Sequence, residues 1–122
     1  DCGRDLWKNT DYTTKDVDTV QFYDGFAFLP LTWLEGLGFC EKGEAHRFIE
    51  GGQRIARDGE LPLNTGGGQL GAGRLHGFGF AHEAVTQLRK AAGPRQIPGD
   101  PKVAVATSGG GPLAAALLLA RD

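Results

Sequence analysis

The spacing of hydrophobic residues predicts a strand and then a helix in the first third of the chain. Residues 17–23 (VDTVQFY) alternate loosely and are rich in β-branched and aromatic side chains, which is typical of a strand. Asp24 and Gly25 break this pattern, and apolar residues then recur at helical spacing to about residue 36. The apolar positions of this helix are Phe26, Leu29, Trp33, Leu34 and Leu37. Pro30 fits if it lies in the first turn, where its missing N–H costs little.

The same two patterns, strand-like alternation and helical spacing of apolar residues, predict the other elements. Before the first strand we expect the end of a helix over residues 1–9 and a single helical turn that Thr13 and Asp16 open as a capping box. After the first long helix we expect, in chain order, a short helix over 44–50, a short strand over 61–64, a helix with Ala81, Val85, Leu88 and Ala92 on one face, and strands over 102–107 and 113–119. This order predicts an α/β fold in which helices pack on a sheet.

The last apolar run, residues 113–119, is ambiguous because leucine and alanine favour helix. Its shortness and the glycine turn before it, residues 108–112, favour a strand.

A glycine-rich stretch over residues 61–80, LPLNTGGGQLGAGRLHGFGF, interrupts this alternation. It holds seven glycines and no acidic residue. Glycine is used this heavily where the backbone takes a positive φ or approaches another group closely. A long loop inside a compact chain is more often functional than idle. We therefore expect this stretch to form the floor of a ligand site.

Composition narrows the class of protein. The 122 residues fit one domain, residues 1–122, with 40% hydrophobic and 23% charged residues. A net charge of −2 without a basic stripe argues against a nucleic-acid partner. The longest apolar run, residues 112–120, is too short for a membrane span, and no signal peptide is visible. Cys2 and Cys40 lack metal-type spacing and are expected as reduced thiols of a cytoplasmic protein.

The chain contains no methionine and starts Asp1-Cys2-Gly3. We therefore expect a fragment of a longer protein, with part of any active site outside this chain.

Three glycine-flanked places lie at predicted strand ends, where loops of one sheet can converge on a pocket. They are residues 23–25, 73–77 and 107–111. His76 could act as a general acid or base near neutral pH, or could be a histidine bonded to backbone at a helix start. Tyr23 could transfer a proton only with a lowered pKa, and spacing alone favours a core aromatic.

Other candidate residues surround these two. Asp24 could orient a neighbour or cap the helix after it, and capping fits better. Arg74 could pair with an anionic group or be solvated. The triple-glycine loops could supply N–H donors to an oxyanion. No Gly-Lys-Ser/Thr follows them, GxGxxG spacing is absent, and Ser108 is not in a Gly-x-Ser-x-Gly elbow, so phosphate-loop, dinucleotide and serine-hydrolase sites have little support.

Three stretches resemble the C-terminal half of thiolase-superfamily proteins, especially the sterol-carrier-protein type. VDTVQFYDGFAFLPLTWLEGLGFCEKGE is similar to that family's strand-turn-helix segment with His-Asp-Cys-Phe. LPLNTGGGQLGAGRLHGFGF resembles its Pro-x-Asn-x-x-Gly-Gly stretch leading to Gly-His-Pro-x-Gly. VAVATSGGGPLAAALLL resembles its closing strand pair. The resemblance covers nearly the whole chain and implies a mixed central sheet of about four to five strands covered by helices.

The chain departs from the thiolase pattern at its catalytic positions. Tyr23 stands where the sterol-carrier type has histidine, Arg74 replaces the histidine of Gly-His-Pro, and Thr107 replaces the acid/base cysteine of ordinary thiolases. The family's nucleophilic cysteine belongs to the N-terminal half. Thiolysis needs those groups, so the resemblance argues against it.

These replacements are similar to those in thiolase-like aldolases, called lipid-transfer proteins, which cleave steroid side-chain acyl-CoA thioesters. The retro-aldol reaction needs no covalent acyl-enzyme and no cofactor beyond the coenzyme A thioester, which is the substrate. Tyr23 matches one proposed acid/base tyrosine of that branch, whereas Phe78 stands where the other is expected. The resemblance also implies a homodimer, the protein's own N-terminal thiolase half, and a small zinc-ribbon/OB-fold partner protein.

This resemblance gives a set of expected site residues. Catalysis is expected from Tyr23, His76 and Asp24. Substrate binding is expected from Asn64, Gly67, Gly68, Arg74, Phe78, Gly109 and Gly110. Two alternatives stay open: a non-catalytic acyl-CoA, lipid-binding or partner-scaffold module, and a thiolase (acetyltransferase) with unusual residues.

Overall fold

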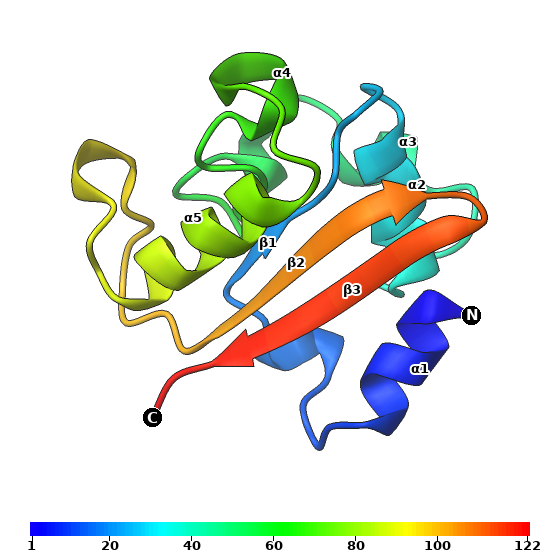
Figure 1. The fold of residues 1–122 in the computed structure, drawn as a ribbon, viewed down its shortest axis with the longest axis horizontal. Coiled ribbons are helices and arrows are strands. Elements are labelled where there is room, and N and C mark those ends of the chain that lie inside the picture. Colours follow the sequence, from blue (N-terminus) through cyan, green and yellow to red (C-terminus); the bar gives the residue numbers. More distant parts are fainter.

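A mixed sheet of three strands organises the chain (Figure 1). The computed structural model describes all residues, Asp1–Asp122. β1 (Thr19–Gln21) runs parallel to β2 (Val103–Gly110), which forms an antiparallel hairpin with β3 (Leu113–Ala120). The strand predicted over residues 113–119 is therefore confirmed, and the one over 102–107 extends further, to Gly110.

The sheet has three strands, and the expected four to five is wrong in number. Residues 61–64 were expected as a strand, but they contribute only an isolated parallel bridge from Leu63 to Val20. At the next residue, Asn64, the side chain and not the backbone pairs with the segment that follows β1. Its Oδ1 accepts the Phe22 N–H (2.6 Å) and its Nδ2 donates to the Phe22 carbonyl (2.9 Å). A side chain that pairs with both backbone groups of Phe22 replaces the ladder that a longer strand would form.

Five α-helices and three 3₁₀ turns surround the sheet. The helices are α1 (Cys2–Lys8), α2 (Leu29–Gly36), α3 (Ala45–Phe48), α4 (Gly68–Ala72) and α5 (Phe78–Leu88). The turns are η1 (Thr14–Asp16), η2 (Gln53–Ile55) and η3 (Gly93–Arg95). None of these helices has the length and apolar character needed to cross a bilayer.

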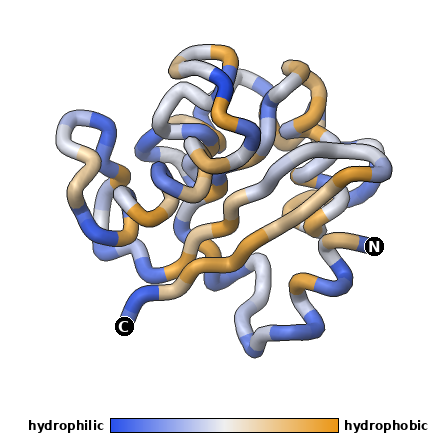
Figure 2. Tube along the Cα trace, viewed as in Figure 1, coloured by the Kyte–Doolittle hydropathy of each residue, from blue (hydrophilic) through white to orange (hydrophobic).

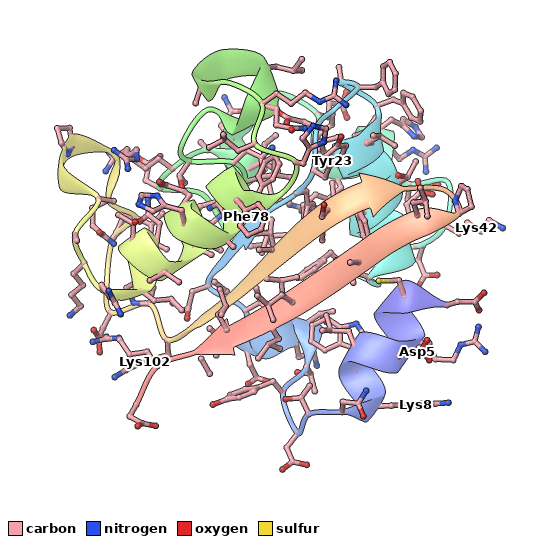
Figure 3. All side chains as sticks on the ribbon, in the orientation of Figure 1. Asp5, Lys8, Tyr23, Lys42, Phe78 and Lys102 are labelled. Carbon is pink, nitrogen blue, oxygen red and sulfur yellow. The ribbon has the colours of Figure 1, made fainter.

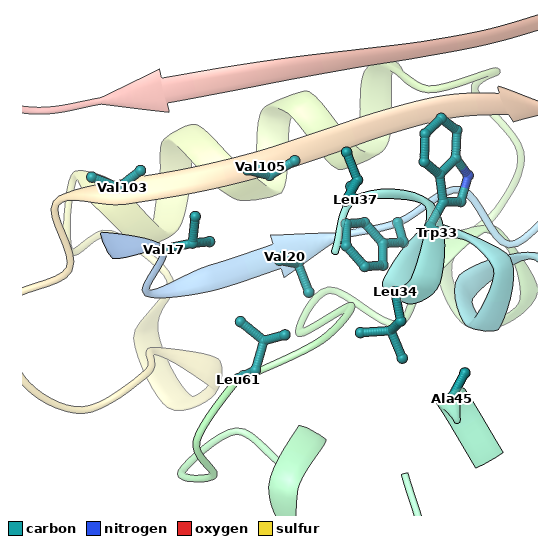
Figure 4. Close-up of a cluster of buried hydrophobic side chains, with 10 residues drawn as sticks. Val17, Val20, Trp33, Leu34, Leu37, Ala45, Leu61, Val103 and Val105 are labelled. Atoms are coloured by element: carbon teal, nitrogen blue, oxygen red, sulfur yellow. The ribbon is translucent and has the colours of Figure 1, made fainter. Parts of the chain in front are cut away.

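Alternate residues of β2 build two separate cores. Val103 and Val105 belong to the larger cluster with Val20 and helix α2, shown in Figure 4. Ala104 and Ala106 belong to the smaller cluster with α5. Because successive side chains of a strand point to opposite faces, α2 and α5 cover opposite sides of the sheet. The small alanines leave room for α5 to lie close to β2.

Local signals read from the sequence are partly confirmed. Thr13 and Asp16 form the predicted capping box at η1, and Pro30 lies in the first turn of α2. Phe26 was expected on the buried face of that helix, but α2 starts only at Leu29. Phe26 is instead 69% exposed and stacks on Phe28. The two cysteines, Cys2 and Cys40, are free.

The edge strand β3 carries an apolar and largely exposed surface. Figure 2 shows hydrophobic colour along most of this strand, and Leu113 is 83% exposed. No further strand pairs with its outer edge. Exposed contiguous apolar surface of this kind marks an interaction face.

Candidate active site

Three segments distant in sequence meet at the carboxyl end of the sheet. The Tyr23 N–H donates to Thr107 Oγ1 (2.8 Å), which ties the end of β1 to β2. The Gln69 N–H donates to Asp24 Oδ1 (2.8 Å), which ties the glycine-rich stretch to β1. The Ser108 hydroxyl donates to the His76 carbonyl (3.2 Å), which ties it to β2. The three glycine-flanked places therefore converge as the sequence predicts.

The glycine-rich stretch is not a plain loop, because it contains α4 and the first turn of α5. Gly67 and Gly77 both have positive φ (89° and 100°) and serve as the N-caps of these helices. A Cβ on Gly77 would lie 2.6 Å from Ser108 Oγ, so only glycine allows this close approach. Asn64 and His76 also have positive φ (51° and 46°), which is uncommon for non-glycine residues. Strained backbone of this kind gathers at functional sites.

Tyr23 is half-buried at the point where β1 ends. Its neighbour Phe22 is fully buried in the larger core, so Tyr23 faces the opposite side. The Tyr23 ring packs on Phe80 of α5, with ring centroids 6.1 Å apart. Its phenol oxygen makes no hydrogen bond within the chain. In the view of Figure 3, Tyr23 lies between the glycine-rich stretch and α2. The phenol is therefore available to a ligand.

Asp24 is buried and has a structural partner. Besides accepting the Gln69 N–H, its carboxylate lies against Gly68, where a Cβ would overlap it. It makes no hydrogen bond to Tyr23 or His76. The cap predicted for Asp24 on the helix that follows it is wrong, because α2 starts at Leu29 without a side-chain cap. Asp24 instead binds an N–H in the first turn of α4. Its catalytic role stays a prediction.

Arg74 and His76, which precede α5, and Phe78, its first residue, are all exposed. Arg74 makes no ion pair, and the imidazole of His76 makes no hydrogen bond within the chain. Phe78 is 79% exposed. His76 and Phe78 lie beside Thr107 and Ser108 at a mainly apolar cavity of about 230 Å³, whose far wall is β3.

The backbone N–H groups expected to hold an oxyanion divide into two kinds. Gly67 N–H donates to the Asn64 carbonyl, whereas the N–H groups of Gly66 and Gly68 have no acceptor in the chain. Gly109 and Gly110 lie opposite Ala114 and Leu113 in the β2–β3 hairpin. The first glycine loop has two N–H groups that are free to donate.

A buried polar network under the glycine-rich stretch was not foreseen from the sequence. Glu83 is buried, and its carboxylate accepts from Thr65, Gln87 and Arg95 at 2.8 to 3.1 Å. Gly66 lies directly above it, because a Cβ there would meet Glu83 Cγ at 3.1 Å. The available signal was the i, i+4 spacing of Glu83 and Gln87 on the apolar face of α5. This network holds in place the residues that lie beneath the glycine-rich stretch.

The same region contains a cavity of about 200 Å³ bordered by Gln69, Glu83 and Phe80. Both polar atoms of the Gln69 amide are buried without a partner. Buried polar groups are nearly always hydrogen-bonded, so this amide is available to an occupant such as water.

Comparison with known proteins shows which proteins this chain resembles. A family model described as Thiolase C-terminal domain-like matches residues 1–120. The 17-hydroxy-3-oxo-4-pregnene-20-carboxyl-CoA lyase of Mycobacterium tuberculosis is 49% identical over 87 residues, which cover 71% of this chain and 22% of the relative. The steroid side-chain-cleaving aldolase of Thermomonospora curvata is 38% identical over 120 residues, covering 98% of this chain and 30% of the relative.

A solved structure gives the same result for the fold. The structure named Ltp2-ChsH2(DUF35) aldolase superposes with a TM-score of 0.87 at 38% identity, over 98% of this chain and 31% of that chain. This chain therefore spans less than a third of the length of each of these relatives.

Proposed function

This chain belongs to the thiolase C-terminal domain-like family, as its motifs predict, and we propose that it forms one half of a lyase that cleaves a β-hydroxy acyl-CoA. The proposed acyl group is a steroid side chain. The names of the two relatives support this reaction class. The observation that carries the proposal is Tyr23, whose phenol has no partner at the place where three site segments converge.

The proposed reaction is a retro-aldol cleavage. A base takes the proton of the substrate's β-hydroxyl, the Cα–Cβ bond breaks, and the β-carbon becomes a ketone carbonyl. The electron pair passes to the α-carbon as a thioester enolate, which then takes up a proton. No acyl group is transferred to the protein, so the cysteine and histidine that a thiolase needs are dispensable.

We assign the acid/base step to Tyr23 with assistance from His76. The ring of Tyr23 is half-buried against Phe80, and its phenol oxygen has no hydrogen-bond partner in the chain, so it could exchange a proton with a bound β-hydroxyl. His76, which precedes α5, is a second titratable group of this end that could supply a proton. Phe78 cannot do so, and we assign it to apolar contact with the substrate.

Polar groups of the glycine-rich stretch would stabilise the enolate and the coenzyme. The N–H groups of Gly66 and Gly68 are free to donate to the thioester oxygen, where negative charge develops. Arg74 is exposed and unpaired, so it could bind an anionic group of coenzyme A. Asn64 and Asp24 would hold this stretch in place through their bonds to Phe22 and Gln69. The coenzyme A thioester itself is the substrate, and no further cofactor is proposed.

The proposal includes partners, because this end of the molecule is rimmed by exposed apolar side chains. They are Phe26, Phe28, Leu70, Leu75 and Phe78. We propose that the N-terminal thiolase half covers this rim and that the whole protein is a homodimer. The solved structure pairs ChsH2(DUF35) with Ltp2 in its name, and this supports a small zinc-ribbon/OB-fold partner protein.

A non-catalytic acyl-CoA-binding or scaffold module is the second candidate. Phe78 favours it, since a phenylalanine stands where the aldolase branch is expected to have its other tyrosine. Such a module would bind the thioester without turnover.

One experiment separates these functions. The full-length protein that contains this chain is incubated with a β-hydroxy steroid acyl-CoA in the absence of free coenzyme A. The proposal predicts a steroid ketone and a shortened acyl-CoA in equal amounts, with no acyl group on the protein. A requirement for free coenzyme A with a labelled acyl-enzyme would indicate a thiolase, and binding without products would indicate the scaffold.

A further inference from the structure

Tyr23 is confined from three sides, and each contact involves a different segment. Thr107, at the end of β2 and 3% exposed, accepts the Tyr23 backbone N–H at 2.8 Å. Phe80 of α5 packs on one side of the ring at an interplanar angle of 53°. Gly25 lies against the other part of the ring, where the phenol oxygen is.

The contact with Gly25 leaves no room for a side chain. A Cβ on Gly25 would lie 2.8 Å from both Cζ and Oη of Tyr23, and still closer to Cε1. Carbon atoms normally approach to about 3.5 Å or more. A methyl group at this position would therefore displace the phenol by about 1 Å or tilt the ring.

The backbone does not itself require glycine at this position. Gly25 has no positive φ, unlike Gly67, Gly68 and Gly77 in the glycine-rich stretch. No atom outside the Tyr23 side chain is among its closest contacts. The ring of Tyr23 is thus the obstacle to a larger residue, and an alanine here would act on the ring.

We propose that Gly25 is a positioning residue for Tyr23, because its missing side chain fixes where the phenol oxygen stands. This inference rests on the proposed role of Tyr23 in retro-aldol cleavage. Catalytic groups tolerate little displacement, and a misplacement of about 1 Å can cost on the order of 100-fold in rate. The Thr107 hydroxyl holds the backbone of Tyr23 while Gly25 sets its side chain.

The test compares Gly25→Ala with a matched glycine substitution in the full-length protein. Gly36, the last residue of α2, also lacks a positive φ, and a Cβ there would meet nothing within 4 Å. We expect Gly25→Ala to lower kcat for the β-hydroxy acyl-CoA roughly 100-fold, with KM and the thermal midpoint little changed. Gly36→Ala should leave kcat at the wild-type value.

A double-mutant cycle with Tyr23→Phe supplies the readout that a purely structural role would not move. If Gly25 acts through the phenol, Gly25→Ala added to Tyr23→Phe causes no further loss of kcat. An equal fold-loss in both backgrounds would overturn the inference, as would full activity of Gly25→Ala beside an impaired Tyr23→Phe. Wild-type activity of Tyr23→Phe would overturn the proposed chemistry as well, so the two failures are distinguishable.

Discussion

The two ends of the sheet differ in their polar residues. At the amino end, Asp18 accepts the N–H groups of Lys102 (2.6 Å) and Val103 (2.9 Å). Asp100, just before β2, forms ion pairs with Lys90, Lys102 and Arg121. These side chains bind one another or the backbone, and they hold the strands together.

At the carboxyl end, several polar groups are left without partners in the chain. They are the Tyr23 phenol, the Arg74 guanidinium, the His76 imidazole and the Gln69 amide. Arg74 and His76 are exposed, whereas the Gln69 amide is buried. Folded proteins pair nearly all buried polar groups, so the unpaired Gln69 amide supports the proposed ligand site. The contrast supports the proposal that the amino end of this sheet serves stability and the carboxyl end binds the substrate.

The largest effect on kcat is expected from Tyr23 of the carboxyl end, with Tyr12 of the amino end as its control. Tyr23→Phe removes the proposed acid/base group, and positioned proton transfer contributes roughly 10²- to 10⁴-fold. We expect a fall in kcat of that size for the β-hydroxy acyl-CoA, measured on the full-length protein. Tyr12, on the exposed connection that leads into β1, is the control, and Tyr12→Phe should keep the wild-type rate.

The next largest effect is expected from Asp24 and Asp18, two aspartates that accept backbone N–H groups at opposite ends of the sheet. Asp24→Ala and Asp18→Ala each remove such a contact, so each should lower the free energy of unfolding by about 1–3 kcal/mol in denaturant titrations. Only Asp24→Ala should also lower kcat, by roughly tenfold under conditions where the protein stays folded, because the glycine-rich stretch loses its anchor at Gln69. Equal kcat values for the two variants would remove the functional distinction between the ends.

A smaller effect is expected from the unpaired arginine of the site end. Arg74→Ala should raise KM for acyl-CoA roughly fivefold, which corresponds to about 1 kcal/mol for an exposed charge contact. The difference from wild type should shrink at high salt, because salt screens exposed charges. Arg89, exposed just after α5 and without an ion pair, is the control, and Arg89→Ala should leave KM unchanged.

The smallest effect concerns the amino end and depends on pH. Hydrogen bonds from Lys90 and Arg121 hold the pKa of Asp100 well below its usual range. A carboxyl group with a lowered pKa stabilises the fold above its unfolded pKa of about 4, and this contribution is lost as pH falls through the folded value. Wild type should therefore be slightly more stable than Asp100→Asn at neutral pH, and the gap in thermal midpoint should narrow only in strong acid. A gap that grows on acidification would contradict this account.

The sequence predicted the elements whose patterns are local and strong. The apolar run after the glycine turn forms β3, and the period of Ala81, Val85 and Leu88 marks α5. The meeting of residues 23–25 with 107–111 was also predictable, since these two places lie at the ends of neighbouring strands, β1 and β2. Residues 73–77 reach the same end from α4 and not from a strand. In each case the signal lay in the residues themselves.

The elements that escaped prediction depend on distant contacts. α4 consists largely of glycine and alanine, and its start is fixed by Asp24, 45 residues away in sequence. The Glu83 network joins α5 to Thr65 and Arg95, and the spacing of residues along the sequence does not indicate these partners. The role of Gly25 depends on where the Tyr23 ring points, which no sequence pattern reveals.

The central claim is that the carboxyl end of the sheet is the substrate site, and hydrogen–deuterium exchange of the full-length protein tests it most directly. The probe is a steroid acyl-CoA that lacks the β-hydroxyl and cannot be cleaved. We predict slower amide exchange at residues 23–25, 64–78 and 107–108 on binding, with no change at residues 89–103 of the amino end. Protection confined to residues 89–103, with none in the glycine-rich stretch, would contradict the account.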